Sequence, residues 1–242
     1  MFSAFGWGLA AASSLVIGMV AALVRPWPRR AVGLVLAFGA GALISAVSFE
    51  LAAEGVAEGS TFSVAVGLAV GALSYYVLDG VVSNRGSNKR GASARSGADN
   101  PGSALALGAL LDGIPEQLVL GIGLAAGNGV GIGLLVAIFV SNLPEAIGSA
   151  DAMRKAGRSR GAVAGIWVSL GVVCAVATVL GYALADAASG ELKAGIDGFA
   201  AGALLVMLVD SMIPDAYRQG GRSAGLATVL GFAVAAGLSS AS

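Results

Sequence analysis

Long apolar runs separated by short polar stretches set the pattern of this chain. A hydrocarbon layer of about 30 Å is crossed by about 20 apolar residues in a helix, so each run near that length predicts one membrane span. Eight such runs occur, at residues 5–24, 31–53, 61–82, 102–126, 130–150, 162–185, 195–217 and 223–241. The pattern therefore predicts an all-α membrane protein in which residues 1–242 form a single transmembrane domain of eight transmembrane helices.

The composition agrees with this class. Hydrophobic residues make up 57% and charged residues 12% of the 242 positions, whereas soluble domains carry about 25% charged residues. The single cysteine, Cys174, falls inside the sixth span, where packing explains it better than metal binding. The basic loops contain no interleaved aromatic residues, so we expect no nucleic-acid partner.

The loop charges predict an orientation. Of the 14 Lys and Arg residues, all but Lys193 fall in alternate loops. The positive-inside rule therefore predicts a multi-pass protein of the plasma membrane with those loops in the cytoplasm and both termini outside. The longest polar stretch, residues 83–101, is rich in Gly and Ser and is expected to be a flexible cytoplasmic loop.

An acidic hexad with one spacing appears twice in the middle of the chain, in spans four and five. The copies are Asp112-Gly113-Ile114-Pro115-Glu116-Gln117 and Ser141-Asn142-Leu143-Pro144-Glu145-Ala146. Each proline lacks an amide donor and clashes with the carbonyl four residues earlier, which predicts a kink beside a glutamate. The turn-forming Gly127-Asn128-Gly129 lies between the copies. A hairpin closed there places Asp112 level with Glu145, and Glu116 level with Ser141.

Carboxylates at this depth need partners. A charge at the bilayer centre costs about 2.5 to 3.5 kcal/mol, so such acids face partners or water and mark a pathway. These two spans contain no Lys or Arg, which leaves a proton, a bound cation or water in a cavity. The simpler alternative is a pair of proline-kinked helices whose acids are neutral and hydrogen-bonded.

A second pattern recurs 161 positions along the chain. Phe38, Ala40, Gly41, Ala42 and Leu43 recur as Phe199, Ala201, Gly202, Ala203 and Leu204. In the predicted orientation spans two and seven run in opposite directions. This favours an inverted repeat of spans 1–3 and 6–8 around the hairpin of spans 4–5, an arrangement that encloses a midplane site. Chance similarity between Gly- and Ala-rich helices is the alternative.

Four further acids are candidates for a pathway. Glu54 aligns with Asp215 in the repeat, and each lies near one predicted mouth, where an ordinary solvated charge at a helix end is the simpler explanation. Glu50 and Asp210 lie deeper in spans two and seven, where an acid is costly without a role.

The hexads resemble motifs of the Zrt/Irt-like (ZIP) divalent-metal transporters, whose fourth and fifth helices carry His-Asn-x-Pro-Glu-Gly-type sequences. Both Pro-Glu pairs are intact, whereas Asp112 and Ser141 stand where histidine or an acid is common, and Gly113 replaces a ligand asparagine. The segment from Gly198 to Ala216 is similar to their seventh helix. The resemblance implies eight helices with both termini outside, in a divergent member without histidine, and a divalent cation as substrate.

On this basis we expect transport of a divalent metal cation such as zinc, manganese, iron or magnesium. The expected ligands are Asp112, Glu116, Asn142 and Glu145, with Ser141 as a weaker one. Because every candidate ligand atom is oxygen, selectivity should shift toward harder ions or broaden. The expected partners are the metal ion and the lipid bilayer, with a homodimer as an assembly to be tested.

Two other functions fit the same residues. In a proton-coupled carrier of a small organic solute the acids would relay protons, and flux would not depend on metal. A non-transporting membrane scaffold or metal sensor would bind without flux. An enzyme is not expected, because the chain has no histidine to pair with a nucleophile.

Overall fold

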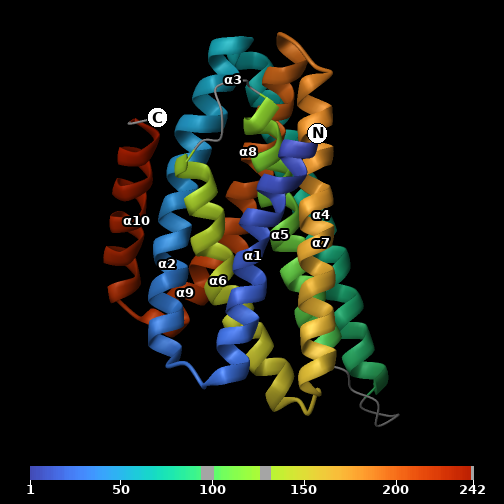
Figure 1. The fold of residues 1–242 in the computed structure, drawn as a ribbon. Coiled ribbons are helices and arrows are strands. Elements are labelled where there is room, and N and C mark those ends of the chain that lie inside the picture. Colours follow the sequence, from blue (N-terminus) through green and yellow to red (C-terminus); the bar gives the residue numbers. More distant parts are fainter. Residues whose placement is uncertain (94–100, 126–131, 241–242) are drawn as a thin grey trace.

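The structure, a computed structural model, describes residues 1–93, 101–125 and 132–240, with side chains throughout except at 82–93, 101–109 and 111. Every element in these ranges is helical (Figure 1). The helices are α1 (Phe2–Val24), α2 (Arg29–Ala46), α3 (Ala53–Glu58), α4 (Thr61–Ser93), α5 (Pro101–Ala125), α6 (Ile132–Lys155), α7 (Arg160–Asp186), α8 (Glu191–Met207), α9 (Ile213–Gly220) and α10 (Ser223–Ser239). Two π-helical turns, η1 (Val47–Ala52) and η2 (Leu208–Met212), join α2 to α3 and α8 to α9.

Six helical segments in the described residues are long and apolar enough to cross a membrane. They are Phe2–Val24, Arg29–Glu58, Thr61–Val81, Ile132–Lys155, Arg160–Asp186 and Glu191–Gly220. Helix α10 is a shorter apolar helix, and α5 covers the predicted fourth span. The described part of the chain is therefore all-helical with several candidate spans, as the apolar runs predict.

The polar stretch after the third span differs from the expected loop. Helix α4 continues to Ser93, so residues 83–93 are helical, because extending an existing helix is easier than starting one. Residues 94–100 of that predicted loop, and the Gly127-Asn128-Gly129 turn, lie outside the described residues.

Proline and glycine mark many of the helix ends. Pro28 immediately precedes α2, and Pro214 lies in the first turn of α9, where its missing amide donor is not needed. Gly157, Gly190 and Gly221 follow α6, α7 and α9 with φ of 85°, 55° and 64°. Residues with a Cβ rarely adopt this conformation, so these turns favour glycine.

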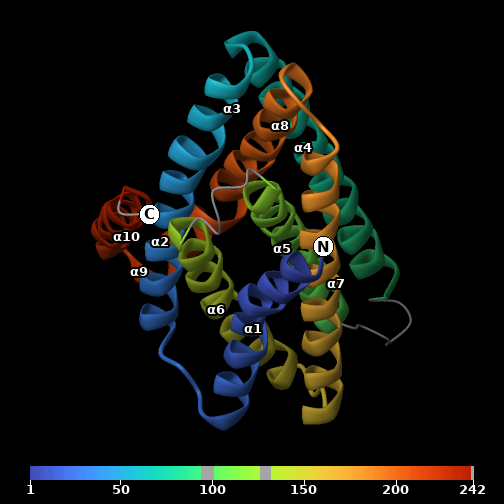
Figure 2. The same ribbon diagram turned by 45° about the horizontal axis from the view of Figure 1, so that its top comes forward.

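The helices pack as two groups that meet along α2/α6 and α5/α8. In the first helix group, α1 and α5 pack on α7, and α1 also packs on α6. In the second helix group, α4 packs on α8, while α10 and α9 pack on α2. Figure 2 shows α5 and α6, which carry the two hexads, within the surrounding helices.

The second helix group contains matching contacts at the offset of the sequence repeat. The turns η1 and η2 begin at Val47 and Leu208, 161 positions apart. A Cβ added to Gly41 would lie 1.8 Å from the Thr228 carbonyl oxygen, and one added to Gly202 would lie 2.1 Å from that of Leu68. The α10–α2 and α4–α8 contacts thus use corresponding glycines, because only glycine lets the two backbones come this close.

We predict that Gly41→Leu strongly destabilises the protein. The new side chain would overlap backbone, which cannot rotate away, so a loss of about 3 kcal/mol and a fall in melting temperature of about 6 to 12 °C are expected. The matched control is Gly165→Leu on α7, where a Cβ meets nothing within 4 Å. Thermal unfolding in detergent tests this. Equal melting temperatures for the two variants would contradict the packing.

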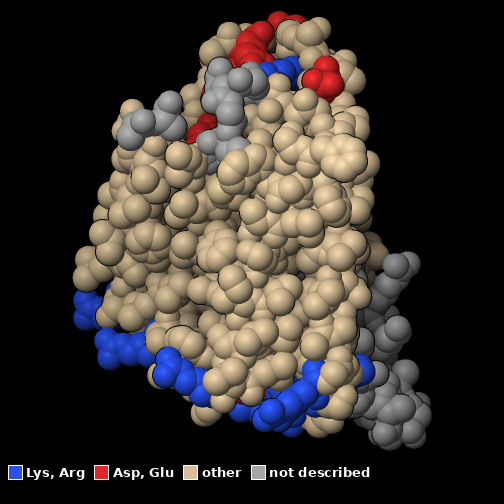
Figure 3. Space-filling view, viewed as in Figure 1, with Lys and Arg blue, Asp and Glu red and all other residues tan. Residues whose placement is uncertain are grey.

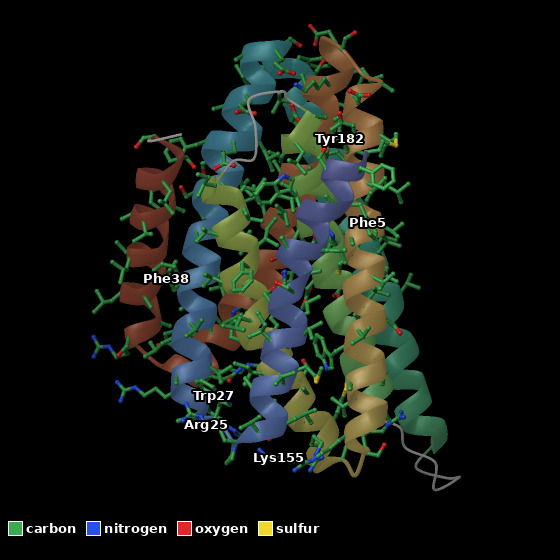
Figure 4. All side chains as sticks on the ribbon, viewed as in Figure 1. Phe5, Arg25, Trp27, Phe38, Lys155 and Tyr182 are labelled. Carbon is green, nitrogen blue, oxygen red and sulfur yellow. The ribbon has the colours of Figure 1, made fainter. Side chains whose placement is uncertain are left out.

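Basic residues gather at one end of the bundle (Figure 3). Arg25, Trp27 and Lys155 lie at this end in Figure 4, and the Arg25 guanidinium carbon is 4.4 Å from the centre of the Trp27 ring. Acidic side chains are visible at the opposite end, beside α3 and the start of α8, and both termini lie toward that end (Figures 1 and 3). The bundle is therefore electrostatically polarised along its length. Which end faces the cytoplasm stays a prediction.

Candidate metal centre

Glu116 joins the two hexads at the centre of the site. Its side chain is 1% exposed. Ser141 Oγ donates to Oε1 at 2.9 Å, and Asn142 Nδ2 donates to Oε2 at 2.8 Å. The contact with Ser141 is the one expected from the hairpin register. Each oxygen of a buried carboxylate on α5 thus has one neutral donor on α6.

Asn142 presents an acceptor atom without a donor. Its Nδ2 contacts Glu116 and the Ile138 carbonyl, the latter at 3.0 Å, so the amide orientation is set by two acceptors. Its Oδ1 is buried and has no hydrogen-bond partner. An unsatisfied buried oxygen is costly, and an amide oxygen of this kind is a suitable ligand for a hard cation.

Small residues enclose the second hexad. A Cβ on Gly18 of α1 would lie 2.5 Å from the Leu143 carbonyl oxygen, and one on Gly39 of α2 would lie 2.7 Å from the Cα of Ser141. These glycines let α1 and α2 approach the backbone beside Pro144. The local sequence therefore brings two helices, α1 and α2, close against α6 beside Pro144.

Asp112 is held by residues that the sequence did not single out. Tyr75 on α4 donates its hydroxyl to Oδ1 at 2.7 Å, and Ser211 on η2 donates to Oδ2 at 3.2 Å. A tyrosine in an apolar span reads as packing or as a membrane-interface anchor, so Tyr75 carried no distinctive signal. Ser211 is adjacent to Asp210, one of the four pathway candidates from the sequence.

A cavity of about 720 Å³ opens at the basic end of the bundle. Its lining includes Asp112, Pro144, Glu145, Ser211 and Asp215, with Arg29, Lys155 and Arg218 also contributing. Glu116, Ser141 and Asn142 are not among the lining residues. The predicted ligands therefore fall into two layers: Asp112 and Glu145 line the cavity, whereas Glu116, Ser141 and Asn142 are buried and do not line it.

The predicted carboxylates do not converge on one point. Among the described residues no group of three or more His, Cys, Asp or Glu side chains is arranged to hold a metal ion. Asp112, Glu116 and Asp215 lie close enough to act on a charge at Glu145, and like charges held together without a cation disfavour one another. A cation shared by Glu116 and Glu145 would need side-chain rotation or oxygen ligands from Asn142 and Ser141.

The four pathway candidates lie in different environments. Glu50 accepts a hydrogen bond from Ser239, Glu54 is half-buried, and Asp215 pairs with Arg218 beside the cavity. Asp210 is exposed and is not among the residues that line this cavity. The π-turn η2 instead directs its neighbour, Ser211, toward Asp112.

Helix α7 contributes neutral groups beside the first hexad. Thr178 Oγ1 donates to Gln117 Oε1 at 2.7 Å, and the buried Gln117 Nε2 has no partner. Cys174 is buried against Gly113, where an added Cβ would lie 3.1 Å from its sulfur. Gly113 therefore leaves the space that the cysteine occupies, which supports a packing role for Cys174.

The chain is similar to an Arabidopsis thaliana protein described as "Putative zinc transporter", to which it is 29% identical over 191 residues. The match covers 77% of the chain but 30% of the relative's length. No family model matches the chain.

Proposed function

We propose that this protein transports a divalent metal cation across a membrane, with Asp112, Glu116, Asn142 and Glu145 as ligands and Ser141 as a weaker one. The observation that carries the proposal is the buried Glu116 carboxylate, which accepts hydrogen bonds from Ser141 and Asn142 of the paired hexad, while Asp112 and Glu145 of the same hexads line a cavity. The similarity to the Arabidopsis relative supports metal-ion transport in general.

Charge balance is the physical reason for a cation. The hydrogen bonds that hold Asp112 and Glu116 come from neutral hydroxyl and amide groups, which leave the negative charge uncompensated. Carboxylate, amide and hydroxyl oxygens are ligands suited to hard divalent ions. A cation entering this cluster would offset the repulsion among the acids, whereas an anion would increase it.

The proposed architecture is eight spans arranged as an inverted repeat around the α5–α6 hairpin. The matching π-turns and the matching glycine contacts support it. An inverted repeat provides two related halves that can open a midplane site to either side. In the proposed orientation both termini lie outside the cell and the cavity faces the cytoplasm. Asp215 then lies at the mouth of the cavity, and Glu50 and Glu54 lie toward the outer side of the membrane.

Metal flux in proteoliposomes tests the function. We expect uptake of a divalent ion, scanned over Zn²⁺, Mn²⁺, Fe²⁺ and Mg²⁺, to exceed that of protein-free vesicles and to saturate. The absence of flux for all four ions would contradict transport, and metal binding without flux would indicate a sensor.

A carrier of a small organic solute is the second candidate, because the cavity has the volume of a small-molecule site, typically 300–1,000 Å³. It predicts solute-driven proton uptake that does not depend on divalent metal. Measuring internal pH in the same vesicles distinguishes the two functions.

We predict that Asp112→His raises the preference for zinc. Imidazole nitrogen is a ligand suited to zinc, whereas carboxylate oxygen suits manganese and magnesium. Replacing the carboxylate by imidazole should therefore shift the site toward zinc. Competition of excess Mn²⁺ or Mg²⁺ against labelled Zn²⁺ should become several-fold weaker in this variant. Asp151→His, on the same cavity wall but outside the proposed ligands, is the control. An unchanged preference in Asp112→His would remove Asp112 from the ligand set.

A further inference from the structure

Tyr75 connects two different environments within the bundle. Its side chain is 5% exposed, and its ring is part of the wall of a second, apolar cavity of about 610 Å³, together with Pro115, Leu118 and Phe199. Its hydroxyl reaches Asp112, which lines the first cavity. The buried side chain therefore borders an apolar cavity, while its hydroxyl is directed at a proposed metal ligand.

The two donors to Asp112 come from across the boundary between the helix groups. Asp112 lies on α5 in the first helix group, whereas Tyr75 lies on α4 and Ser211 on η2, both in the second helix group. An isolated aspartate on a helix samples several rotamers. Two donors, one on each carboxylate oxygen, select a single orientation.

We propose that Tyr75 is a positioning residue for cation binding, a role that rests on the proposed function. Its hydroxyl, together with that of Ser211, holds the Asp112 carboxylate in the orientation that faces the cavity. Each carboxylate oxygen has two acceptor positions, so one donor on each leaves one position on each for a cation. The donors are neutral, so the charge of Asp112 remains available to the metal.

The expected effect of losing Tyr75 follows from the population of binding-competent orientations. Apparent affinity falls in proportion to the fraction of molecules in the competent state. If the Asp112 side chain then populates about three staggered rotamers, the binding-competent fraction falls about threefold, and it falls further if another donor binds the carboxylate in a different orientation. KM should therefore rise about 3- to 10-fold. The maximal rate should change little, because Tyr75 does not itself contact the ion.

Metal flux of Tyr75→Phe against Tyr76→Phe tests the proposal. The two variants make one chemical change at adjacent positions, but Tyr76 is 65% exposed. We expect KM to rise in Tyr75→Phe and to stay at the parent value in Tyr76→Phe. We expect no further effect when Tyr75→Phe is added to Asp112→Ala, because the role runs through Asp112. Ser211→Ala should give a smaller rise in KM, since its hydrogen bond is longer, and it replaces Tyr75→Phe if that variant does not fold.

A flux-independent measurement separates this proposal from the proposed function. In metal-free protein, infrared bands of the Asp112 carboxyl group, identified by their loss in Asp112→Ala, should shift in Tyr75→Phe and not in Tyr76→Phe. A parent protein that carries no metal would overturn the proposed function, while the band shift would still establish the contact on which positioning depends. Three results would overturn the role of Tyr75 in a protein that does carry metal. The first is equal KM values for Tyr75→Phe and Tyr76→Phe. The others are an effect of Tyr75→Phe that is just as large in the Asp112→Ala background, and a carboxyl band that does not shift in Tyr75→Phe.

Discussion

Glu116→Gln should reduce metal flux at least about 100-fold while leaving the protein folded. In the proposed site, the Glu116 carboxylate and the bound cation form a buried charge pair. Removing one partner of such a pair costs about 2 to 5 kcal/mol of binding free energy, and every 1.4 kcal/mol is a factor of ten in affinity. Glutamine keeps the size of the side chain. Its carbonyl oxygen can accept from Asn142, and its amide can donate to the Ser141 hydroxyl, so both contacts of the parent survive.

Three measurements test this expectation: initial uptake in proteoliposomes, equilibrium metal binding and thermal unfolding. Glu58→Gln is the matched control, because it makes the same chemical change at an exposed position near the end of α3. Glu58 pairs with Lys193 there, so the loss of that ion pair is the only change in stability expected of the control. We expect melting temperatures near that of the parent for both variants and loss of flux only for Glu116→Gln. Parent-like binding and flux in Glu116→Gln would show that the buried carboxylate is not a ligand.

Glu145→Gln should raise the metal concentration needed for half-maximal flux at least about tenfold. Glu145 lines the cavity with Asp112, so its charge acts on an ion that enters from the basic end. Loss of about 1.4 kcal/mol of attraction corresponds to a factor of ten. The variant should be at least as stable as the parent in the absence of metal, because Glu145 is repelled by Asp112, Glu116 and Asp215.

The metal dependence of the melting temperature distinguishes a ligand from a nearby charge. A bound ion stabilises the folded state by RT ln(1 + [L]/Kd), where [L] is the free ion concentration, so a weaker site gives a smaller rise in melting temperature at the same concentration. Added metal should therefore stabilise the parent and Glu58→Gln more than Glu145→Gln at the same concentration. An equal rise in all three proteins would indicate that Glu145 does not bind the ion.

The apolar runs determined the class of the fold by themselves. The burial of about 20 apolar residues in hydrocarbon requires a helix, because its backbone hydrogen bonds are satisfied within the segment. Most of the observed helix ends therefore fall within a few residues of the predicted spans. The spacing of the two hexads also predicted one contact between them. Glu116 and Ser141 are equally far along the chain from the predicted turn, so a hairpin brings them to the same level, and they are hydrogen-bonded in the structure.

The tertiary structure decided which polar side chains face the site. The π-turns insert a residue into spans two and seven and rotate the helix that follows, so Ser211 and not Asp210 points at Asp112. Sequence periodicity assumes a uniform turn and cannot anticipate such a shift. Tyr75 is brought to Asp112 by the packing of α4 on α8 and of α8 on α5, contacts between segments far apart in the chain.

The division of the acids into two layers is likewise a property of packing. The sequence placed Asp112 level with Glu145 and Glu116 level with Ser141, because helical rise fixes depth along the axis. Whether a side chain at a given depth faces a cavity or a neighbouring helix depends on how the helices are rotated and how closely they approach. Gly18 and Gly39 set that approach around the second hexad, so Glu116 is enclosed while Glu145 reaches the cavity.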